Sequence, residues 1–206
     1  MRIIKIACMF FAVSMLTNCA SGYKEIQLKS INYISKNEDS DIILEYKYDL
    51  LDKKYAKKET KRGVKLVAVR ITNNSEKDII FGRDVKLGYV NGHELYVMDN
   101  DKVYKTLKQS PASYLWYLLL TPINFYTYET NSYGGQETTS SFPIGLILGP
   151  GIAGGNMIAS ANANKKFKTQ MLDYNLNGTV IKSGEIKHGL IGIEADTYEA
   201  LTLTVQ

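Results

Sequence analysis

Hydrophobic and polar residues alternate with a period of two over much of residues 20–100, and the alternation returns near the end of the chain. Tyr, Ile and Val are frequent in these segments, and polar or Gly/Asn clusters separate them, which is typical of short β-strands. The predicted strands are Lys24–Ser35, Asp41–Leu51, Gly63–Asn73, Ile79–Phe81, Asp84–Val90, His93–Met98, Thr179–Lys182, Glu185–Ile193 and the C-terminal ALTLTV. About seven to nine short strands at this spacing indicate a mainly β protein, and we expect an antiparallel immunoglobulin-like β-sandwich.

Two of these segments carry additional information. The run Lys65–Ile71 (KLVAVRI) is apolar in both phases, which predicts a central strand that is covered on both faces. Asn91-Gly92 lies between two alternating segments and predicts a type I′ hairpin, because both central positions of that turn need positive φ. The lysine-rich stretch Asp52–Arg62 is expected to be a solvated loop, with contact to anionic lipid headgroups or an acidic partner as the alternative.

The pattern changes in the middle of the chain, where Gln109–Tyr128 contains no formal charge. Ser110-Pro111 predicts the start of a helix, since Ser caps free N–H groups and Pro is tolerated in the first turn. Every residue from Tyr114 to Leu120 is apolar, so this helix has no polar face. The candidate contacts with a membrane or a partner are Tyr114, Leu115, Trp116, Tyr117, Leu118 and Leu119.

The second uncharged segment is Thr138–Asn164. Its first residues overlap the end of a polar stretch, Glu129–Ser141, that is expected to be a flexible loop. Gly149-Pro150 predicts the start of another helix. Small residues then recur four apart and form a candidate helix-packing stripe, which consists of Gly151, Gly155, Ala159 and Ala163. We therefore expect an apolar helical pair inserted into the sandwich at about residues 101–175.

Three interpretations of the apolar segments 111–128 and 143–164 remain open. They pack on each other inside the folded domain, they lie against a membrane, or they form a docking surface for an integral envelope protein. Trp and Tyr favour the membrane interface, and an apolar aromatic patch is also what a protein partner recognises.

The N-terminus adds a location. Arg2 and Lys5 precede an uncharged apolar run, Ile6–Leu16, which would span roughly 16 Å as a helix and is too short for a stable membrane span. This layout is typical of a secretory signal. The four residues Leu16-Thr17-Asn18-Cys19 resemble the lipobox of bacterial membrane lipoproteins.

The lipobox resemblance implies that residues 1–18 are a signal peptide and that Cys19 begins a mature single domain, residues 19–206. It also implies lipidation of the Cys19 thiol, with labelling by palmitate, and a lipid anchor in the bacterial cell envelope. Ala20 does not resemble an acidic retention signal, so outer-membrane attachment facing the periplasm is expected. Ordinary secretion with cleavage after Ala20 or Ser21, or an uncleaved anchor, are the alternatives.

Cysteine content and charge restrict the function further. Cys8 lies in the segment that would be removed and Cys19 would be lipidated, so no cysteine pair is left for a disulfide. Loss of Arg2 and Lys5 lowers the formal net charge of +4 to +2. That balance, together with export, argues against a nucleic-acid partner.

The sequence contains no recognisable catalytic motif. His93 and His188 are the two histidines, and both are expected at surface or edge positions of strands. Asp99-Asn100-Asp101 is expected to be a turn or a helix cap rather than a calcium loop. We therefore expect no catalysis and no metal or cofactor, and a structural or protein-binding role. The alternatives are a carrier or sensor of a lipid-like ligand, or a membrane-perturbing protein.

Overall fold

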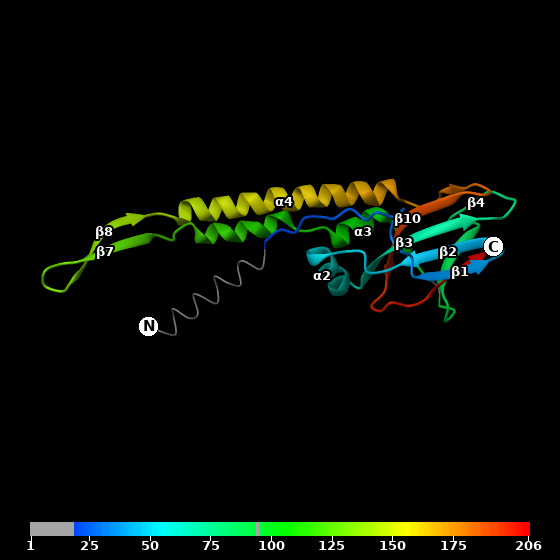
Figure 1. Cartoon of the computed structure of the whole chain (residues 1–206), viewed down its shortest axis with the longest axis horizontal. Helices are drawn as coiled ribbons and strands as arrows, with labels where there is room; N and C mark the ends of the chain where they lie inside the picture. The colour runs from blue at the N-terminus through cyan, green and yellow to red at the C-terminus, as the bar shows by residue number, and fades with distance from the viewer. Residues whose placement is uncertain (1–18, 94) are drawn as a thin grey trace. The chain divides into compact units, whose positions relative to one another are not determined.

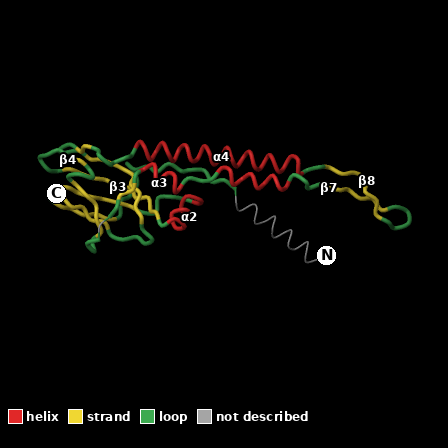
Figure 2. The backbone as a smooth tube through the Cα atoms, turned by 180° about the vertical axis from the view of Figure 1, so that it is seen from behind, coloured by secondary structure: helices red, strands yellow, loops and turns green. Residues whose placement is uncertain are grey.

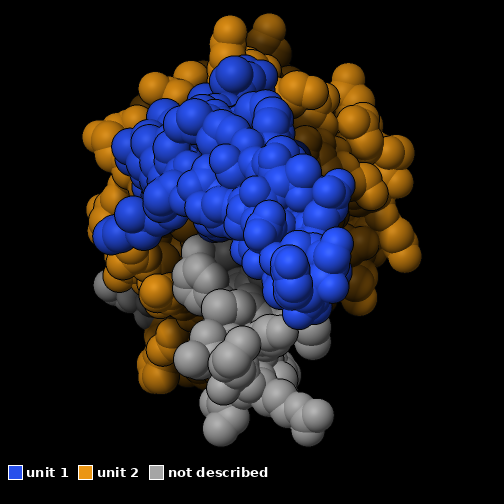
Figure 3. Space-filling view, turned by 90° about the vertical axis from the view of Figure 1, so that its left-hand side faces the viewer, with its two compact units in different colours: residues 1–22, 109–162 blue, residues 23–108, 163–206 orange. Residues whose placement is uncertain are grey.

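The computed structural model describes residues 19–93 and 95–206, and the expected signal peptide lies outside them (Figure 1). The chain divides into two compact units, which are coloured separately in Figure 3. The sheet unit comprises residues 23–108 and 163–206. The inserted unit comprises residues 109–162 together with the short segment 19–22 of the described chain. The insertion is thus narrower than the expected 101–175, because residues 101–108 and 163–175 belong to the sheet unit.

The strands of the sheet unit are yellow in Figure 2, and they form antiparallel pairs. Its largest sheet has five strands in the order β1 (Ser35–Asp39), β2 (Ile42–Lys47), β3 (Val64–Asn73), β10 (Ile186–Glu194) and β6 (Val97–Met98). Two smaller sheets are pairs, β11 (Leu201–Val205) with β5 (Val85–Tyr89), and β4 (Ile79–Ile80) with β9 (Val180–Ile181). A mainly antiparallel β architecture is therefore confirmed.

The central strand β3 is buried on both faces, as its continuous apolar pattern predicts. Val67, Val69 and Ile71 belong to a core cluster that also contains side chains of β5 and β11. Leu66 and Ala68 point the other way, into a second cluster that contains helical residues. Since successive side chains of a strand point to opposite faces, one strand supplies both cores.

Helices cover the second face. They are α2 (Lys53–Arg62), α3 (Asn100–Leu107) and the C-terminal part of α4 (Gly145–Asp173). The prediction of a loop at Asp52–Arg62 is wrong: the lysines occupy the exposed side of α2, while Tyr55 and Glu59, four residues apart, are buried. The side chain of Asp99 accepts hydrogen bonds from the N–H groups of Asp101 (2.8 Å) and Lys102 (3.3 Å), so the predicted cap is confirmed.

Other predictions of the strand pattern differ from the structure. The immunoglobulin-like sandwich is not confirmed, because the strands divide into one sheet of five and several pairs. No strand forms between Lys24 and Ile34. Instead Tyr23, Ile26 and Leu28 anchor this segment to the helical side of the sheet. The sequence of β1, SKNED, lacks apolar residues, so alternation could not reveal it.

The type I′ turn predicted at Asn91-Gly92 is also wrong, because only Gly92 of the two has a positive φ (86°). The chain does turn there: the N–H of Gly92 donates to the carbonyl of Tyr89, and the N–H of Tyr89 donates to the carbonyl of His93. The ladder of β5 is formed with β11. The positive φ values that a type I′ turn needs occur at Ser40 (50°) and Asp41 (64°), between β1 and β2.

The inserted unit contains a 3₁₀ helix, η1 (Pro111–Leu120), a hairpin of β7 (Phe125–Thr130) and β8 (Gln136–Phe142), and the N-terminal part of α4. The helix start predicted at Pro111 is confirmed. The flexible loop predicted over Glu129–Ser141 is wrong, because most of it forms β8 and the end of β7. The second helix begins at Gly145, and Pro150 lies within it. The expected apolar helical pair is not confirmed, because a 3₁₀ segment and one 29-residue helix form instead.

One buried carboxylate in the sheet unit has an unusual environment. Glu59 is 3% exposed and accepts a hydrogen bond from the N–H of Leu66 at 2.7 Å. Burial raises the pKa of Glu59 to about 7, although the Leu66 hydrogen bond and the charge of Lys65 act in the opposite direction. Because the folded chain holds this proton more tightly than an unfolded chain would, the carboxylate form costs stability.

We predict that the stability of the protein falls as pH rises from about 4.5 to 7, and that Glu59→Gln removes this component. Below this range Glu59 is protonated in both states, and above it the cost is constant at about 3 kcal/mol. Urea unfolding of both proteins between pH 4 and pH 8 measures the difference. Parallel pH profiles would show that Glu59 titrates normally.

Candidate functional site

The segment that follows Cys19 is held by side chains of the inserted unit. Gln109, which is 2% exposed, accepts a hydrogen bond from the N–H of Ser21 (3.1 Å) and donates one to the carbonyl of Ser21 (2.6 Å). The N–H of Ala20 donates to the side-chain oxygen of Asn156 on α4. These contacts fix the backbone on the C-terminal side of Cys19, whose own side chain is exposed.

Cys19 lies close to two tyrosines of η1. Tyr114 and Tyr117 are 3% and 5% exposed, and their rings stack with centroids 6.4 Å apart. Burial raises the pKa of both hydroxyls, and the neighbouring Cys19 adds to that effect. Together with Ala153 they form the small core of the inserted unit, against which Ala20 also packs.

The three-residue period of η1 decides which candidate contacts are buried. Side chains three apart eclipse each other in a 3₁₀ helix, so Tyr114, Tyr117 and the partly buried Leu120 form one line towards α4. The other four candidates, Leu115 (47% exposed), Trp116 (70%), Leu118 (42%) and Leu119 (64%), lie outside that line. The six residues predicted as one contact surface therefore divide into two buried tyrosines and four exposed side chains.

Close approach of η1 and α4 depends on two glycines. A Cβ atom at Gly145 would overlap the carbonyl oxygens of Leu120 and Thr121, and one at Gly149 would lie 2.8 Å from the Thr121 hydroxyl. Ala153 continues this line one turn further and is 3% exposed. The helix start is also tied to the turn after η1, because the N–H of Gly145 donates to the carbonyl of Ile123 at 2.8 Å.

The predicted packing stripe lies on a different side of α4. A Cβ atom at Gly151 or Gly155 would meet no neighbouring element within 4 Å, and Ala159 is exposed. Gly151 follows Gly149 by two residues, which is about 200° around a helix, so the stripe begins almost opposite the contact that forms. Ala163 is buried, but in the core of the sheet unit. Residues four apart on an α-helix are rotated by about 40° around its axis, so the last residue of the stripe lies on another side of α4 than the first.

The inserted unit exposes an unusual amount of apolar surface. Residues 109–162 contain two charged side chains, Glu129 and Glu137, and no lysine or arginine. Of the 21 large hydrophobic side chains that are exposed in the described chain, 14 belong to this unit. We define this apolar surface by its members: Leu115, Trp116, Leu118, Leu119, Ile123, Phe125, Tyr126, Tyr128, Tyr133, Phe142, Leu146, Ile147, Leu148 and Ile158.

The hairpin of β7 and β8 contributes aromatic residues and free strand edges. Every residue of both strands is exposed, and among the described residues each strand pairs only with the other. Its two charged residues, Glu129 and Glu137, carry like charges and face each other across the two strands. A two-stranded hairpin without a covered face is marginal in water, so its stability depends on what lies against it.

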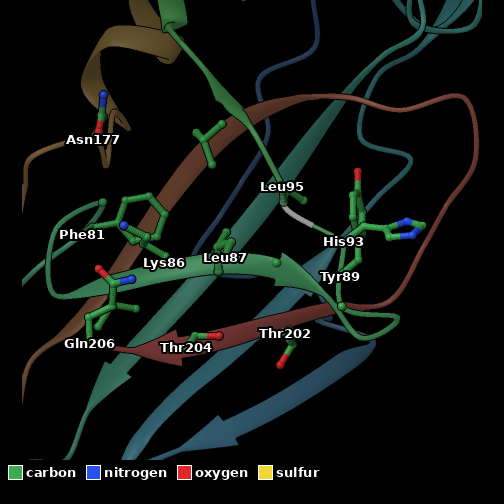
Figure 4. A pocket seen from close by; sticks show the side chains of 15 residues that line it. Phe81, Lys86, Leu87, Tyr89, His93, Leu95, Asn177, Thr202, Thr204 and Gln206 are labelled. Carbon is green, nitrogen blue, oxygen red and sulfur yellow. The ribbon is translucent and has the colours of Figure 1, made fainter.

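A separate groove lies over β5 and β11 in the sheet unit (Figure 4). Its volume is about 520 Å³, and its walls alternate between apolar and polar side chains, including Leu87, Lys86, Thr202 and Gln206. His93 lies at the rim, in the turn after β5, and not in a strand as predicted. The groove is open and lacks the convergent acid, base and nucleophile that catalysis needs.

The remaining histidine, His188, lies on β10 as predicted and is half-buried beside Tyr33, with ring centroids 6.3 Å apart. Burial and the nearby Arg70 lower its pKa. Among residues 19–93 and 95–206, no three His, Cys, Asp or Glu side chains are placed to hold a metal ion together. In the same part of the chain, no helix has the length and hydrophobicity needed to cross a membrane.

Comparisons with protein-family models, with curated proteins and with solved structures give no match.

The contact of η1 with α4 predicts opposite effects for two glycine substitutions. Gly145→Ala forces a side-chain carbon into the carbonyl groups of η1 and should destabilise the inserted unit by about 1–3 kcal/mol. Gly155→Ala meets open space in the same helix and should stabilise it by about 0.5–1 kcal/mol. Amide hydrogen exchange of residues 146–160 measures both changes. Equal protection in the two variants would contradict the observed packing.

Proposed function

We propose that this protein is a bacterial lipoprotein, anchored through acylated Cys19 in the cell envelope, most simply in the outer membrane with the folded chain in the periplasm. Its role is structural or protein-binding, without catalysis, and its apolar surface docks on an integral envelope protein. The observation that carries the proposal is that the exposed Cys19 lies beside Tyr114 and Tyr117 of η1, in the unit that also carries the apolar surface.

Two features support an anchored inserted unit. The hydrogen bonds of Ala20 and Ser21 leave little slack between a lipid on Cys19 and the unit, so the lipid would hold the apolar surface at the membrane. The surface carries no cation, and charged residues are depleted at the centre of protein interfaces while aromatic residues are enriched.

A protein partner explains the hairpin better than direct insertion into lipid does. The outer edges of β7 and β8 present unpaired N–H and C=O groups, and such edges are not found in the hydrocarbon region of a membrane. A partner that supplies a strand satisfies those groups by β-augmentation. The exposed Trp116 and Tyr128 are of the residue types that most often carry interface energy.

The other roles find less support. A carrier of a lipid-like ligand needs an enclosed apolar cavity, whereas the groove over β5 and β11 is open and partly polar.

Around the first core cluster, where β5 and β11 pack with the larger sheet, an immunoglobulin-like sandwich remains our interpretation of the fold.

The lipid anchor is tested by Cys19→Ala in cells that are fed labelled palmitate. The unmodified protein should incorporate label and sediment with the membrane fraction, and the variant should do neither, because the thiol is the acylation site. Trypsin digestion of the variant checks that the folded part is intact. Label on the Cys19→Ala protein would sink the anchor proposal.

Docking is tested by Trp116→Asp, with Ile34→Asp as the matched control. Trp116 is 70% exposed in the inserted unit and Ile34 is 76% exposed in the sheet unit, so neither change should unfold the protein. After crosslinking in envelopes, the complex with a membrane protein should be reduced at least tenfold by Trp116→Asp and be unaffected by Ile34→Asp, since about 2 kcal/mol or more is typical of a central interface tryptophan.

Equal yields of the crosslinked complex from both variants would show that the apolar surface is not the docking site. Loss of the fold in Trp116→Asp alone would instead show that the tryptophan belongs to a core.

A further inference from the structure

The helical side of the sheet unit carries a cluster of positive charges. Lys58, Lys61 and Arg62 lie on α2, Lys105 and Lys108 at the end of α3, and Lys168 on α4. We call these six residues the basic cluster. They come from three elements that are separate in sequence, so a lysine-rich stretch of sequence explains only part of the cluster.

Contacts between the three helices hold these charges together. Lys58 donates a hydrogen bond to the carbonyl of Lys108, which joins α2 to α3. The ammonium groups of Lys108 and Lys168 lie 5.6 Å and 5.4 Å from the centroid of the same ring, that of Tyr104. That shared ring joins α3 to α4.

The cluster is under mutual repulsion. Burial lowers the pKa of Lys58, and the charges of Arg62, Lys108 and Lys61 lower it further. Asp101 forms an ion pair with Lys105, and Asp99 acts on the same lysine. Glu194 and Asp196 line a pocket together with Arg62. Six cations against these four carboxylates leave the cluster at +2. An anionic partner would relieve this repulsion.

The remainder of the mature chain has no net charge. Residues 19–206 contain 23 basic and 21 acidic side chains, because Arg2 and Lys5 are the charged residues before Cys19. Without the cluster and its four carboxylates, 17 basic side chains face 17 acidic ones. The positive charge is therefore concentrated on one side of one unit, which favours a partner with an extended negative surface.

The position of Cys19 in the chain identifies which negative surface is within reach. Three residues separate Cys19 from Tyr23, and a chain of that length spans at most about 14 Å. Tyr23 packs against Tyr55 of α2 and Phe167 of α4, with ring centroids 5.4 Å and 5.2 Å away. A lipid on Cys19 thus keeps the core beneath these helices close to the headgroups.

We propose that the basic cluster binds the phosphate headgroups of anionic phospholipids in the bilayer that holds the lipid anchor. The inference rests on the proposed anchoring at Cys19, which would bring the basic cluster close to the headgroups. Lysine and arginine side chains near an anionic bilayer each add to the attraction, and the effect fades within about a Debye length. A lipid on Cys19 would keep the cluster within that range, and the cluster would add its own affinity for anionic headgroups.

Binding is measured without the acyl chain, so that failure of the anchor proposal and failure of this one are distinguishable. The mature chain, residues 19–206 with Cys19→Ser, is mixed with vesicles of phosphatidylcholine alone or with phosphatidylglycerol added. The expected result is binding to the phosphatidylglycerol vesicles that is at least tenfold tighter and is lost in high salt. Equal affinity for both vesicles would overturn the proposal.

Two triple variants of equal charge locate the surface. Lys61→Gln, Arg62→Gln and Lys168→Gln together should weaken binding to anionic vesicles by about 100-fold, at about fivefold for each side chain. The control replaces three exposed lysines of the β part with Gln, at Lys77, Lys86 and Lys182, and should change binding less than tenfold. Equal losses in both variants would overturn the proposal, and so would binding to polyglutamate but not to vesicles, which would identify an acidic protein as the partner.

Discussion

The three-residue repeat of η1 determines how the inserted unit meets its surroundings. Tyr114, Tyr117 and Leu120 form one line of side chains that packs towards α4. The residues between them are also apolar, but they lie outside that line and stay exposed. Gly145 and Gly149 bring the backbones so close that no second layer of side chains fits between them. The unit consequently has a core of three buried hydrophobic residues and a much larger apolar exterior. Exposed apolar area of that extent marks an interaction surface.

The sheet unit buries its apolar side chains in two cores. Its strand β3 has a core on each side, and helices α2, α3 and α4 close one of them. The outer sides of these helices carry the basic cluster, in which like charges repel one another. The two units thus differ in surface chemistry, one apolar and almost uncharged, the other locally cationic. Both properties suit a protein held at a membrane by Cys19, and they would contact different chemical partners there.

Much of the sheet unit could be predicted from the sequence, because burial on one or two faces leaves a direct pattern, as in Lys65–Ile71 and ALTLTV. The hairpin β7–β8 and strand β1 could not be, since neither buries an alternating face. Helix α2 was concealed by six basic residues, although the spacing of Tyr55 and Glu59 was available as a signal. For the candidate site, the sequence indicated the right segments but not their sides. An all-apolar run contains no information on which of its side chains are buried. In α4 the sequence holds two series of small residues: Gly145, Gly149 and Ala153, which pack against η1, and the predicted stripe of Gly151, Gly155, Ala159 and Ala163.

The central claim is the proposal that the exposed side of η1 contacts an integral membrane protein in the cell envelope. A photo-reactive amino acid in place of Trp116, with the same replacement at Ile34 as reference, tests it in intact cells. We expect a discrete crosslinked product with an integral protein from position 116 and none from position 34. Crosslinks from position 116 to lipid alone, or the same products from both positions, would contradict the claim.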